Sequence, residues 1–328
     1  MCTAITYLTK DFYFGRNLDL YYSYQECVTI APRNYGFSFR NGERLKNHLA
    51  MIGMATVSEN YPLYYDATNE AGLSLAALNF PNNATYYPQS NTKANIAPFE
   101  LIPWVLGQCR NVEEALALIK EINLWNTPFN PDFPLSPLHW MLSDRTASYT
   151  LEPMANGLNI HSNKIGILTN NPPFDFQMHN LTKYINLTNK VPENRFSNQI
   201  DLYPFSLGMG AIGLPGDPSS PSRFVKAAFT KLNSVSGSSE SESISQFFHI
   251  LSAVAQQRGI THANNEEFEY TLYSSCCNTN KGIYYYTTYE NSQICAVDMN
   301  KENLNGRALV SYPLMKGQQV YFQNNHQE

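Results

Sequence analysis

The chain has 328 residues, of which 43% are hydrophobic, and its 22 lysines and arginines against 27 aspartates and glutamates give a net charge of −5. This length and apolar content allow a large buried core, which argues against intrinsic disorder. No basic cluster is present, and no apolar stretch approaches the roughly 18 residues that span a bilayer. Because the N-terminus also lacks the pattern of a signal peptide, we expect a cytoplasmic protein with a small-molecule ligand and neither a nucleic-acid nor a membrane partner.

Short runs rich in β-branched and aromatic residues predict strands at both ends of the chain. These runs cover residues 3–8, 12–16, 27–31, 73–78, 270–274, 283–289 and 294–299. Turn-forming residues at 278–282 and 290–292 separate the last three, which predicts an antiparallel meander.

Three segments of the middle region have the periodicity of amphipathic helices. The first covers residues 112–122 behind Asn111 as N-cap, the second covers 222–232, and the third covers 244–254 with Gly259 closing it. The serine-rich residues 234–243 before the third predict a solvated surface loop and not a domain boundary. Strands at both ends with helices between them indicate an α+β fold, in one domain of residues 2–328 once Met1 is removed.

Residue 2 is the first candidate for chemistry. A methionine followed by a residue as small as cysteine is a substrate for methionine aminopeptidase, which would leave Cys2 at the N-terminus. Its α-amine, with an ordinary pKa of about 7.7–8.0, is a suitable base for a thiol of pKa about 8.5. Nucleophile and base then belong to one residue. From Met1 and Cys2 alone, the favoured interpretation of Cys2 is an ordinary strand residue.

The neighbours of Cys2 strengthen the chemical interpretation. Residues 9–11 separate two predicted strands by a length typical of a hairpin. Paired residue numbers then sum to about 20 or 21, which places Cys2 opposite residue 18 or 19. Arg16 and Asp19 therefore lie beside the thiol, where the cation stabilises a thiolate and the carboxylate holds the α-amine.

Six ordered blocks carry a family resemblance across nearly the whole chain. They are residues 1–3 (MCT), 14–19 (FGRNLD), 78–81 (LNFP), 168–172 (LTNNP), 213–217 with 222–224 (GLPGD and SRF) and 281–286 (KGIYYY). The series resembles the choloylglycine hydrolase family of N-terminal-nucleophile hydrolases, which includes bile salt hydrolases and penicillin V acylases.

The resemblance implies a four-layer αββα fold with two packed antiparallel sheets, an amide hydrolase without cofactor or metal, and a homotetramer. It also assigns site residues by position. These are Cys2 as nucleophile, Arg16 and Asp19 as its electrostatic partners, Asn79 and Asn170 as oxyanion donors through a backbone N–H and a side chain, and Arg223 as electrostatic support. From local chemistry alone, a polar turn is the favoured interpretation of residues 170–173.

The resemblance favours conjugated bile salts over penicillin V, because Asn79 stands where penicillin V acylases tend to carry tyrosine. Pro173 departs from the threonine common in the family. We expect four residues to contact substrate, namely Leu18, Tyr24, Phe129 and Phe133. The aromatic loops 126–137 and 61–65 suit the walls of an apolar cleft, or equally a satellite core cluster. Penicillin V acylase and a non-catalytic steroid-binding protein with a retained Met1 are the alternatives.

Other patterns predict no site. Residues 208–213 (GMGAIG) match a dinucleotide fingerprint, but Pro215 and Pro218 follow where that motif needs a helix, so we expect a loop. The seven histidines, His326 among them, lack zinc-site spacing. We interpret His139 as a structural histidine with its hydrogen bonds satisfied, and not as part of a Cys-His pair.

Overall fold

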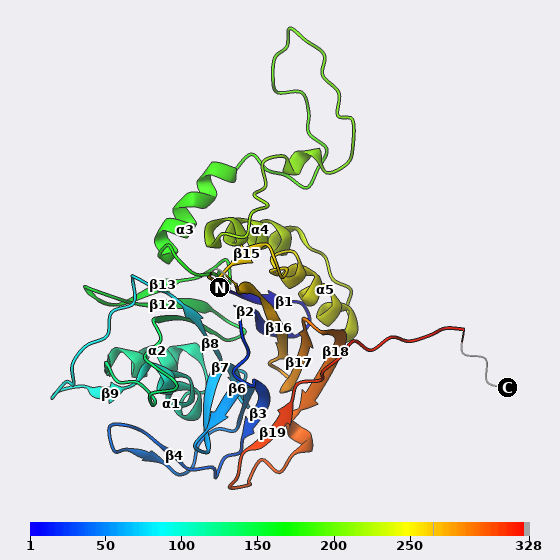
Figure 1. Cartoon of the computed structure of the whole chain (residues 1–328). Helices are drawn as coiled ribbons and strands as arrows, with labels where there is room; N and C mark the ends of the chain where they lie inside the picture. Colours follow the sequence, from blue (N-terminus) through cyan, green and yellow to red (C-terminus); the bar gives the residue numbers. More distant parts are fainter. Residues whose placement is uncertain (265, 325–328) are drawn as a thin grey trace.

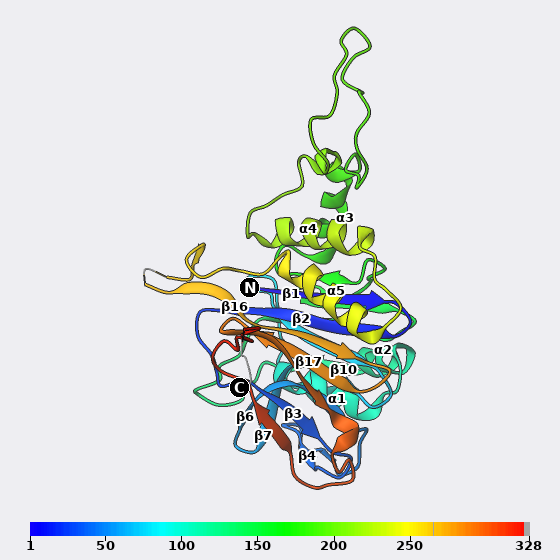
Figure 2. The ribbon, with the colours of Figure 1, turned by 90° about the vertical axis from the view of Figure 1, so that its right-hand side faces the viewer.

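Two antiparallel sheets form the centre of the protein, as Figures 1 and 2 show. The structure is a computed structural model and describes residues 1–264 and 266–324; His326 lies outside the described residues. Helices α4 and α5 cover one sheet, and α1 packs on the other with α2 beside it. The predicted four-layer αββα fold is confirmed.

The first sheet has the strand order β14-β1-β2-β16-β17-β18, with β15 pairing with β16. Its strands are β1 (Cys2–Leu8), β2 (Phe12–Leu20), β14 (Ile167–Leu168), β15 (Thr261–His262), β16 (Phe268–Asn278), β17 (Ile283–Thr288) and β18 (Asn291–Asp298). The predicted meander is present as β16, β17 and β18. The predicted hairpin is β1 with β2, and it pairs Cys2 with Leu18.

The second sheet has the order β13-β12-β11-β8-β7-β6-β3-β19. Its strands are β3 (Cys27–Ala31), β6 (Met51–Ser58), β7 (Tyr61–Asn69), β8 (Ser74–Asn79), β11 (Leu138–Ser143), β12 (Ser148–Met154), β13 (Gly157–Ser162) and β19 (Val310–Pro313). Two small pairs stand apart, β4 (Phe37–Ser38) with β5 (Arg44–Leu45), and β9 (Ala94–Ile96) with β10 (Ile122–Leu124). The expected aromatic loop 61–65 is wrong, because this segment starts β7 and alternates buried and half-buried residues.

The helices are α1 (Leu101–Gln108), α2 (Val112–Lys120), α3 (Phe174–Asn180), α4 (Ser220–Asn233) and α5 (Glu240–Ser252). The side chain of Asn111 accepts from the backbone of Glu114, so the predicted N-cap of α2 is confirmed. The predicted C-terminal ends of α2 and α5 are wrong. Ile122, expected in α2, begins β10, and α5 ends well before Gly259. Ser239 caps α5, so the last four residues of the serine-rich segment are helical. Residues 208–213 contain only a short 3-10 turn, as expected of a loop.

The two sheets divide the interior into two packed regions. One apolar cluster joins the first sheet to α4 and α5 and to the facing strands of the second sheet. The other joins the outer face of the second sheet to α1 and α2. Cys2 belongs to the first cluster, so the candidate nucleophile is anchored where strands of both sheets and a helix meet.

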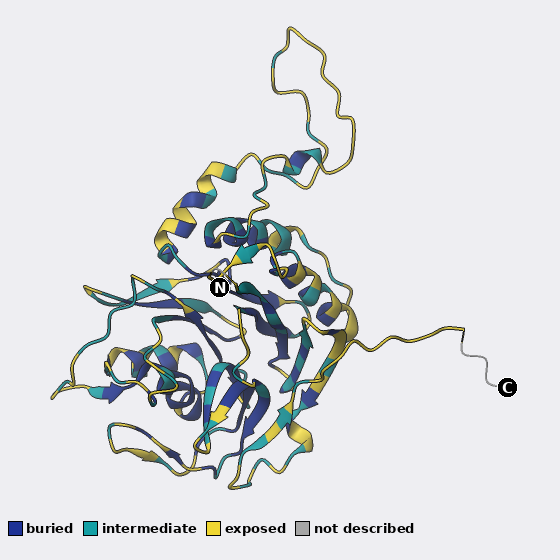
Figure 3. Cartoon of the chain, viewed as in Figure 1, coloured by how far each residue is buried: buried dark blue, intermediate teal, exposed yellow. Residues whose placement is uncertain are grey.

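Two segments extend away from this body, as the exposed colouring in Figure 3 shows. The arm, residues 186–207, lies beyond α3, and the tail, residues 314–324, ends the described chain. Within the described ranges, no helix combines the length and apolarity that crossing a membrane requires.

Candidate active site

Cys2 is the first residue of β1 and is 3% exposed. Its backbone nitrogen donates to Oδ1 of Asn170 at 2.7 Å. Arg223 donates to the same Oδ1 at 2.8 Å through Nη2, and to the carbonyl oxygen of Cys2 at 2.5 Å through Nη1. Since Met1 is still attached, this nitrogen is a peptide nitrogen that stands in for the free α-amine. The structure thus brings Cys2, Asn170 and Arg223 together from β1, the segment after β14, and α4.

Met1 lies over the edge of the first sheet. Its amine donates to the carbonyl oxygen of Asp19 at 2.7 Å and contacts the carboxylate of Glu269. Burial lowers the pKa of this amine, an effect that the nearby Cys2 and Asp19 oppose. The terminal amine therefore lies among hydrogen-bond acceptors and buried charges of both signs, and its pKa is lowered overall.

Asp19 is fully buried on β2. Its Oδ1 accepts from the hydroxyl of Thr271 at 2.6 Å. Its Oδ2 is buried and has no hydrogen-bond partner within the described part of the chain. Burial raises the pKa of this carboxyl, whereas Arg223 and the terminal amine lower it. One carboxylate oxygen is thus available to an α-amine at this end of the sheet, the role that the sequence predicts for Asp19.

Arg16 reaches from the first sheet to the second. Its Nη1 donates to the carbonyl oxygen of Tyr65 at 3.0 Å and also to that of Ala77. Burial by itself lowers the pKa of this guanidinium, but negative charge on Cys2 and other neighbours raises it above its usual value. Arg16 is thus a fully buried cation close enough to Cys2 for the two to interact electrostatically, as the sequence predicts.

Asn79 ends β8 on the side of the sheet that faces Asn170. The N–H of Phe80 donates to Pro137 at 2.7 Å, so Asn79 and its partner Leu138 form a non-hydrogen-bonded pair. Both polar backbone groups of Asn79 therefore point away from β11. The carbonyl oxygen accepts from Nδ2 of Asn170 at 2.7 Å, which places the backbone N–H on that same side.

This geometry is compatible with the oxyanion site that the family resemblance predicts. The Nδ2 group of Asn170 carries two hydrogens, and its bond to Asn79 uses one. The second hydrogen and the N–H of Asn79 are two donors close to the start of β1. Such donors stabilise the negative oxygen that forms when a thiolate attacks an amide carbonyl.

Several supporting residues were not predicted from the sequence. The hydroxyl of Ser220 accepts from the backbone N–H of Asn170 at 2.8 Å. Behind Arg16, Asp66 accepts from the hydroxyls of Tyr273 at 3.0 Å and Tyr284 at 2.7 Å. These contacts join residues far apart in the sequence, and no local pattern marks them. The one available signal is a single charged residue in a strand that is otherwise uncharged, as Asp66 is in β7.

The family model described as "Linear amide C-N hydrolases, choloylglycine hydrolase family" matches residues 2–312. The chain belongs to the choloylglycine hydrolase family. It is a hydrolase of linear amide C–N bonds.

Two curated relatives are both named bile salt hydrolase/transferase. The one from Lactiplantibacillus plantarum is 53% identical over 99% of this chain and 100% of its own. The one from Clostridium perfringens is 40% identical over 96% and 98%. A crystal structure titled as the C2A mutant of the conjugated bile acid hydrolase from Clostridium perfringens is similar with a TM-score of 0.91 and 38% identity, covering 99% of this chain and 100% of that one.

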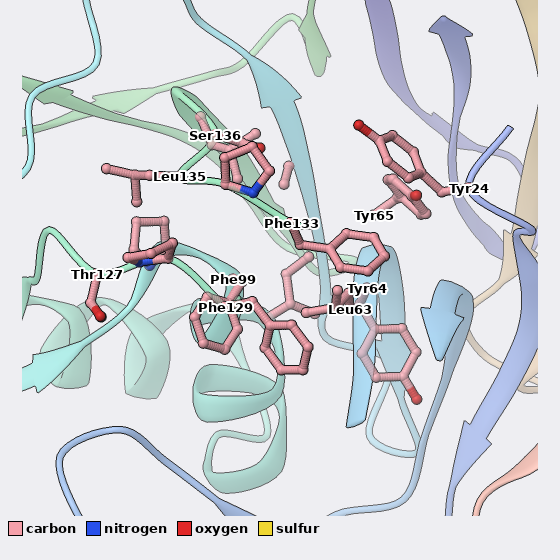
Figure 4. A pocket seen from close by; sticks show the side chains of 16 residues that line it. Tyr24, Leu63, Tyr64, Tyr65, Phe99, Thr127, Phe129, Phe133, Leu135 and Ser136 are labelled. Atoms are coloured by element: carbon pink, nitrogen blue, oxygen red, sulfur yellow. The ribbon is translucent and has the colours of Figure 1, made fainter. Parts of the chain in front are cut away.

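A cavity lies beside the site of this choloylglycine hydrolase family member (Figure 4). Its open volume is about 880 Å³, which includes space that is open to solvent. Ala77, whose carbonyl oxygen accepts from Arg16, and Leu138, the strand partner of Asn79, form one wall. The remaining lining is mostly aromatic and apolar, including Tyr24, Leu63, Tyr65, Phe99, Phe129, Phe133 and Leu135.

The predicted contact residues fall in two places. Tyr24, Phe129 and Phe133 line the cavity, and the ring centroids of Tyr24 and Phe133 are 5.5 Å apart. Phe129 also packs against Phe99 at 5.2 Å, so it is at once a wall and part of an aromatic cluster. Leu18 is 3% exposed and lies in the core opposite Cys2, and a substrate contact there stays a prediction.

No group of three or more histidine, cysteine, aspartate or glutamate side chains is arranged to hold a metal ion in the ranges that the structure describes. Pro173 occupies the N-cap position of α3. The consequence of that proline for substrate choice is not visible in the geometry.

The burial of Asp19 predicts a pH effect. Because burial raises its pKa, we expect this carboxyl to gain a proton, and release the α-amine, at higher pH than a surface aspartate would, whose pKa is about 3.9. The Asp19→Asn variant should lose about 10- to 100-fold in kcat/KM at neutral pH, the cost of a charged hydrogen bond. Its pH–rate profile should also be flatter on the acid side than the wild-type profile. Identical acid limbs in both proteins would contradict this role.

Proposed function

We propose that this protein is a bile salt hydrolase that cleaves the amide bond between a bile acid and glycine or taurine, with Cys2 as nucleophile after removal of Met1. The observation that carries the proposal is the convergence on residue 2. Its nitrogen contacts Asn170, its carbonyl oxygen contacts Arg223, and Asp19 and Arg16 lie buried beside it.

The acylation step follows from these positions. The thiol proton of Cys2 passes to its own α-amine, which Asp19 and Asn170 orient, and Arg16 favours the resulting thiolate. The thiolate attacks the amide carbonyl, and the backbone N–H of Asn79 and Nδ2 of Asn170 receive the oxyanion. The ammonium then gives its proton to the amine nitrogen as the C–N bond breaks, which releases glycine or taurine and leaves a thioester.

Deacylation uses the same groups in reverse order. The α-amine, again neutral, takes a proton from a water molecule that attacks the thioester carbonyl. The same two donors hold the second oxyanion. Collapse of this intermediate breaks the C–S bond, and the proton on the amine returns to sulfur as the bile acid leaves.

The cavity supports a bulky apolar acyl group. Its walls are chiefly aromatic and apolar, and they include Ala77, whose carbonyl oxygen accepts from Arg16, and Leu138, the strand partner of Asn79, so an acyl chain attacked at Cys2 can extend into it. A rigid steroid suits such a preformed pocket, because little conformational entropy is lost on binding. The names of the two relatives point to the same substrate class.

Assays of purified protein on glycocholate, taurocholate and penicillin V test the proposal. We expect both conjugated bile salts to be cleaved with higher kcat/KM than penicillin V. Preferential cleavage of penicillin V would make the protein a penicillin V acylase. Bile salt binding without cleavage, with Met1 retained, would favour the non-catalytic steroid-binding alternative.

The aromatic wall gives a prediction of its own. Replacing Phe133 by alanine removes a large apolar contact from the cavity but no group near the reacting atoms. We expect KM for glycocholate to rise by about 10-fold or more, with kcat little changed. Phe322, which is 61% exposed on the tail, is the matched control, and its replacement by alanine should leave KM unchanged. Equal effects of the two substitutions would contradict the assignment of the cavity.

We further propose that residues 2–328 form one domain and that the protein is cytoplasmic and homotetrameric. The arm supports self-association, because Phe196, Tyr203, Phe205 and Leu207 are each more than 80% exposed. A group of large exposed apolar side chains on a protruding segment favours a protein contact. Sedimentation should show a tetramer for wild type and smaller species for a Phe205→Ser, Leu207→Ser double variant; identical masses would contradict the role of the arm.

A further inference from the structure

His139 lies behind both oxyanion donors. It is fully buried on β11. Its Nε2 lies 2.8 Å from the carbonyl oxygen of Thr169, the residue before Asn170. Its ring stacks on Phe80, the residue after Asn79, with centroids 4.2 Å apart and planes within 5°. One side chain therefore contacts the chain neighbour of each donor.

Glu152 extends this support to the far end of the same loop. It lies on β12 and is 1% exposed. Its Oε1 accepts from the backbone N–H of Phe174 at 2.9 Å and lies 3.3 Å from Nδ1 of His139. His139 and Glu152 together thus hold residues 169 and 174, which are the two ends of the segment that carries Asn170.

The protonation of this pair follows from its partners. A carbonyl oxygen can only accept, so the Nε2 that bonds to Thr169 carries hydrogen. Nδ1 on the other side of the ring faces the Glu152 carboxyl at 3.3 Å, and Nε2 of His161 lies 3.5 Å from the second oxygen of that carboxyl. The carboxyl and the imidazole are therefore a matched pair, and a pair of this kind is less costly to bury than either group alone.

We propose that His139 and Glu152 are positioning residues of the oxyanion site, fixing Asn170 relative to the backbone N–H of Asn79. The inference rests on the proposed catalytic role of those two donors. A purely apolar side chain at position 139 could fill the space and stack on Phe80, but it would leave the carbonyl oxygen of Thr169 unbonded in the interior. The bond to Thr169 thus links β11, which borders Asn79, to the loop of Asn170. Oxyanion stabilisation depends on such preorganisation of the donors.

Replacement of His139 by phenylalanine tests this arrangement, because it keeps a stacked ring and removes both hydrogen bonds. We expect kcat on glycocholate to fall by roughly 10²-fold, as for small misplacements of reacting groups, with KM little changed. The rate of Cys2 alkylation by iodoacetamide should stay near the wild-type value, since that displacement builds no oxyanion. A His139→Gln variant can still donate to Thr169 and should recover part of kcat.

His48 offers a matched control. It is 7% exposed, bonds to two backbone carbonyl oxygens at 2.7 and 2.8 Å, and packs on Phe37, within the other core cluster. His48→Phe removes equivalent bonds from an equivalent environment and should leave kcat unchanged.

Three results with the variants would overturn the proposal. These are an unchanged kcat in His139→Phe, a parallel loss of hydrolysis and alkylation that marks general unfolding, or an equal loss in His48→Phe. If the wild type cleaves penicillin V and not bile salts, the proposed substrate is wrong, and the same comparison is made on penicillin V, whose amide hydrolysis builds the same oxyanion. A wild type that cleaves neither overturns both proposals.

Discussion

Replacement of Cys2 by alanine is expected to lower kcat on glycocholate by on the order of 10⁶-fold, the loss typical of removing the nucleophile of a hydrolase. The substitution leaves the α-amine, the oxyanion donors and the cavity in place, so it removes the covalent route alone. Alanine, like cysteine, is small enough to allow removal of Met1. Substrate should still bind, and the KM or the dissociation constant for glycocholate should change little.

Cys109 is the matched control for this experiment. Like Cys2 it is 3% exposed, but it lies in the other core cluster beside α1. Cys109→Ala should retain wild-type kcat. A Cys2→Ser variant measured beside it keeps the geometry with a poorer nucleophile and should be strongly impaired. Full amidase activity in Cys2→Ala would refute the mechanism.

Replacement of Asn170 by alanine is expected to lower kcat by about 10²–10³-fold, the cost of one oxyanion donor. The amide group is both a donor and an acceptor. Its Nδ2 donates to the carbonyl oxygen of Asn79, and its Oδ1 accepts from Cys2 and from Arg223. Asn170→Asp keeps the acceptor but replaces the donor with a carboxylate oxygen that repels the developing charge. We therefore expect the aspartate variant to lose at least as much kcat as the alanine variant.

Single-turnover kinetics with glycocholate locates this loss in acylation. Asn291, which is 1% exposed at the start of β18 and accepts from the backbone of Gln293, is a control for loss of a buried asparagine. Asn291→Ala should retain wild-type kcat. Acylation at the wild-type rate in Asn170→Asp would contradict an oxyanion role for Nδ2.

The parts of the fold that the sequence predicted depend on local chemistry. The register of β1 and β2 follows from a three-residue connection, and the start of α2 from its asparagine cap. The seven ranges predicted as strands all coincide largely with strands. Local signals were weaker for α1, whose almost continuously apolar sequence LIPWVLGQ has no polar face and contains proline and glycine. Helix ends were also misplaced, since α5 ends at Ser252 although the apolar periodicity continues to Val254.

The residues of the candidate site also differ in how they could be predicted. Hairpin geometry placed Arg16 and Asp19 beside Cys2, whereas Asn79, Asn170 and Arg223 came from the family resemblance alone. The contacts of Asp66, Ser220 and His139 join distant strands and loops, so neither periodicity nor spacing indicates them. These positions share a buried polar side chain, and burial of this kind is visible in the structure but not in the sequence.

The central claim is that Cys2 acts with its own α-amine, and intact mass spectrometry of active, purified protein tests it most directly. The mechanism needs a free amine at the Cys2 nitrogen, because this atom must take up the thiol proton. While Met1 is attached, the same atom is a peptide nitrogen and cannot do so. We predict that protein active on conjugated bile salts has the mass of the chain that begins at Cys2. Full activity in protein whose mass includes Met1 would place the amine on the wrong residue and contradict the mechanism.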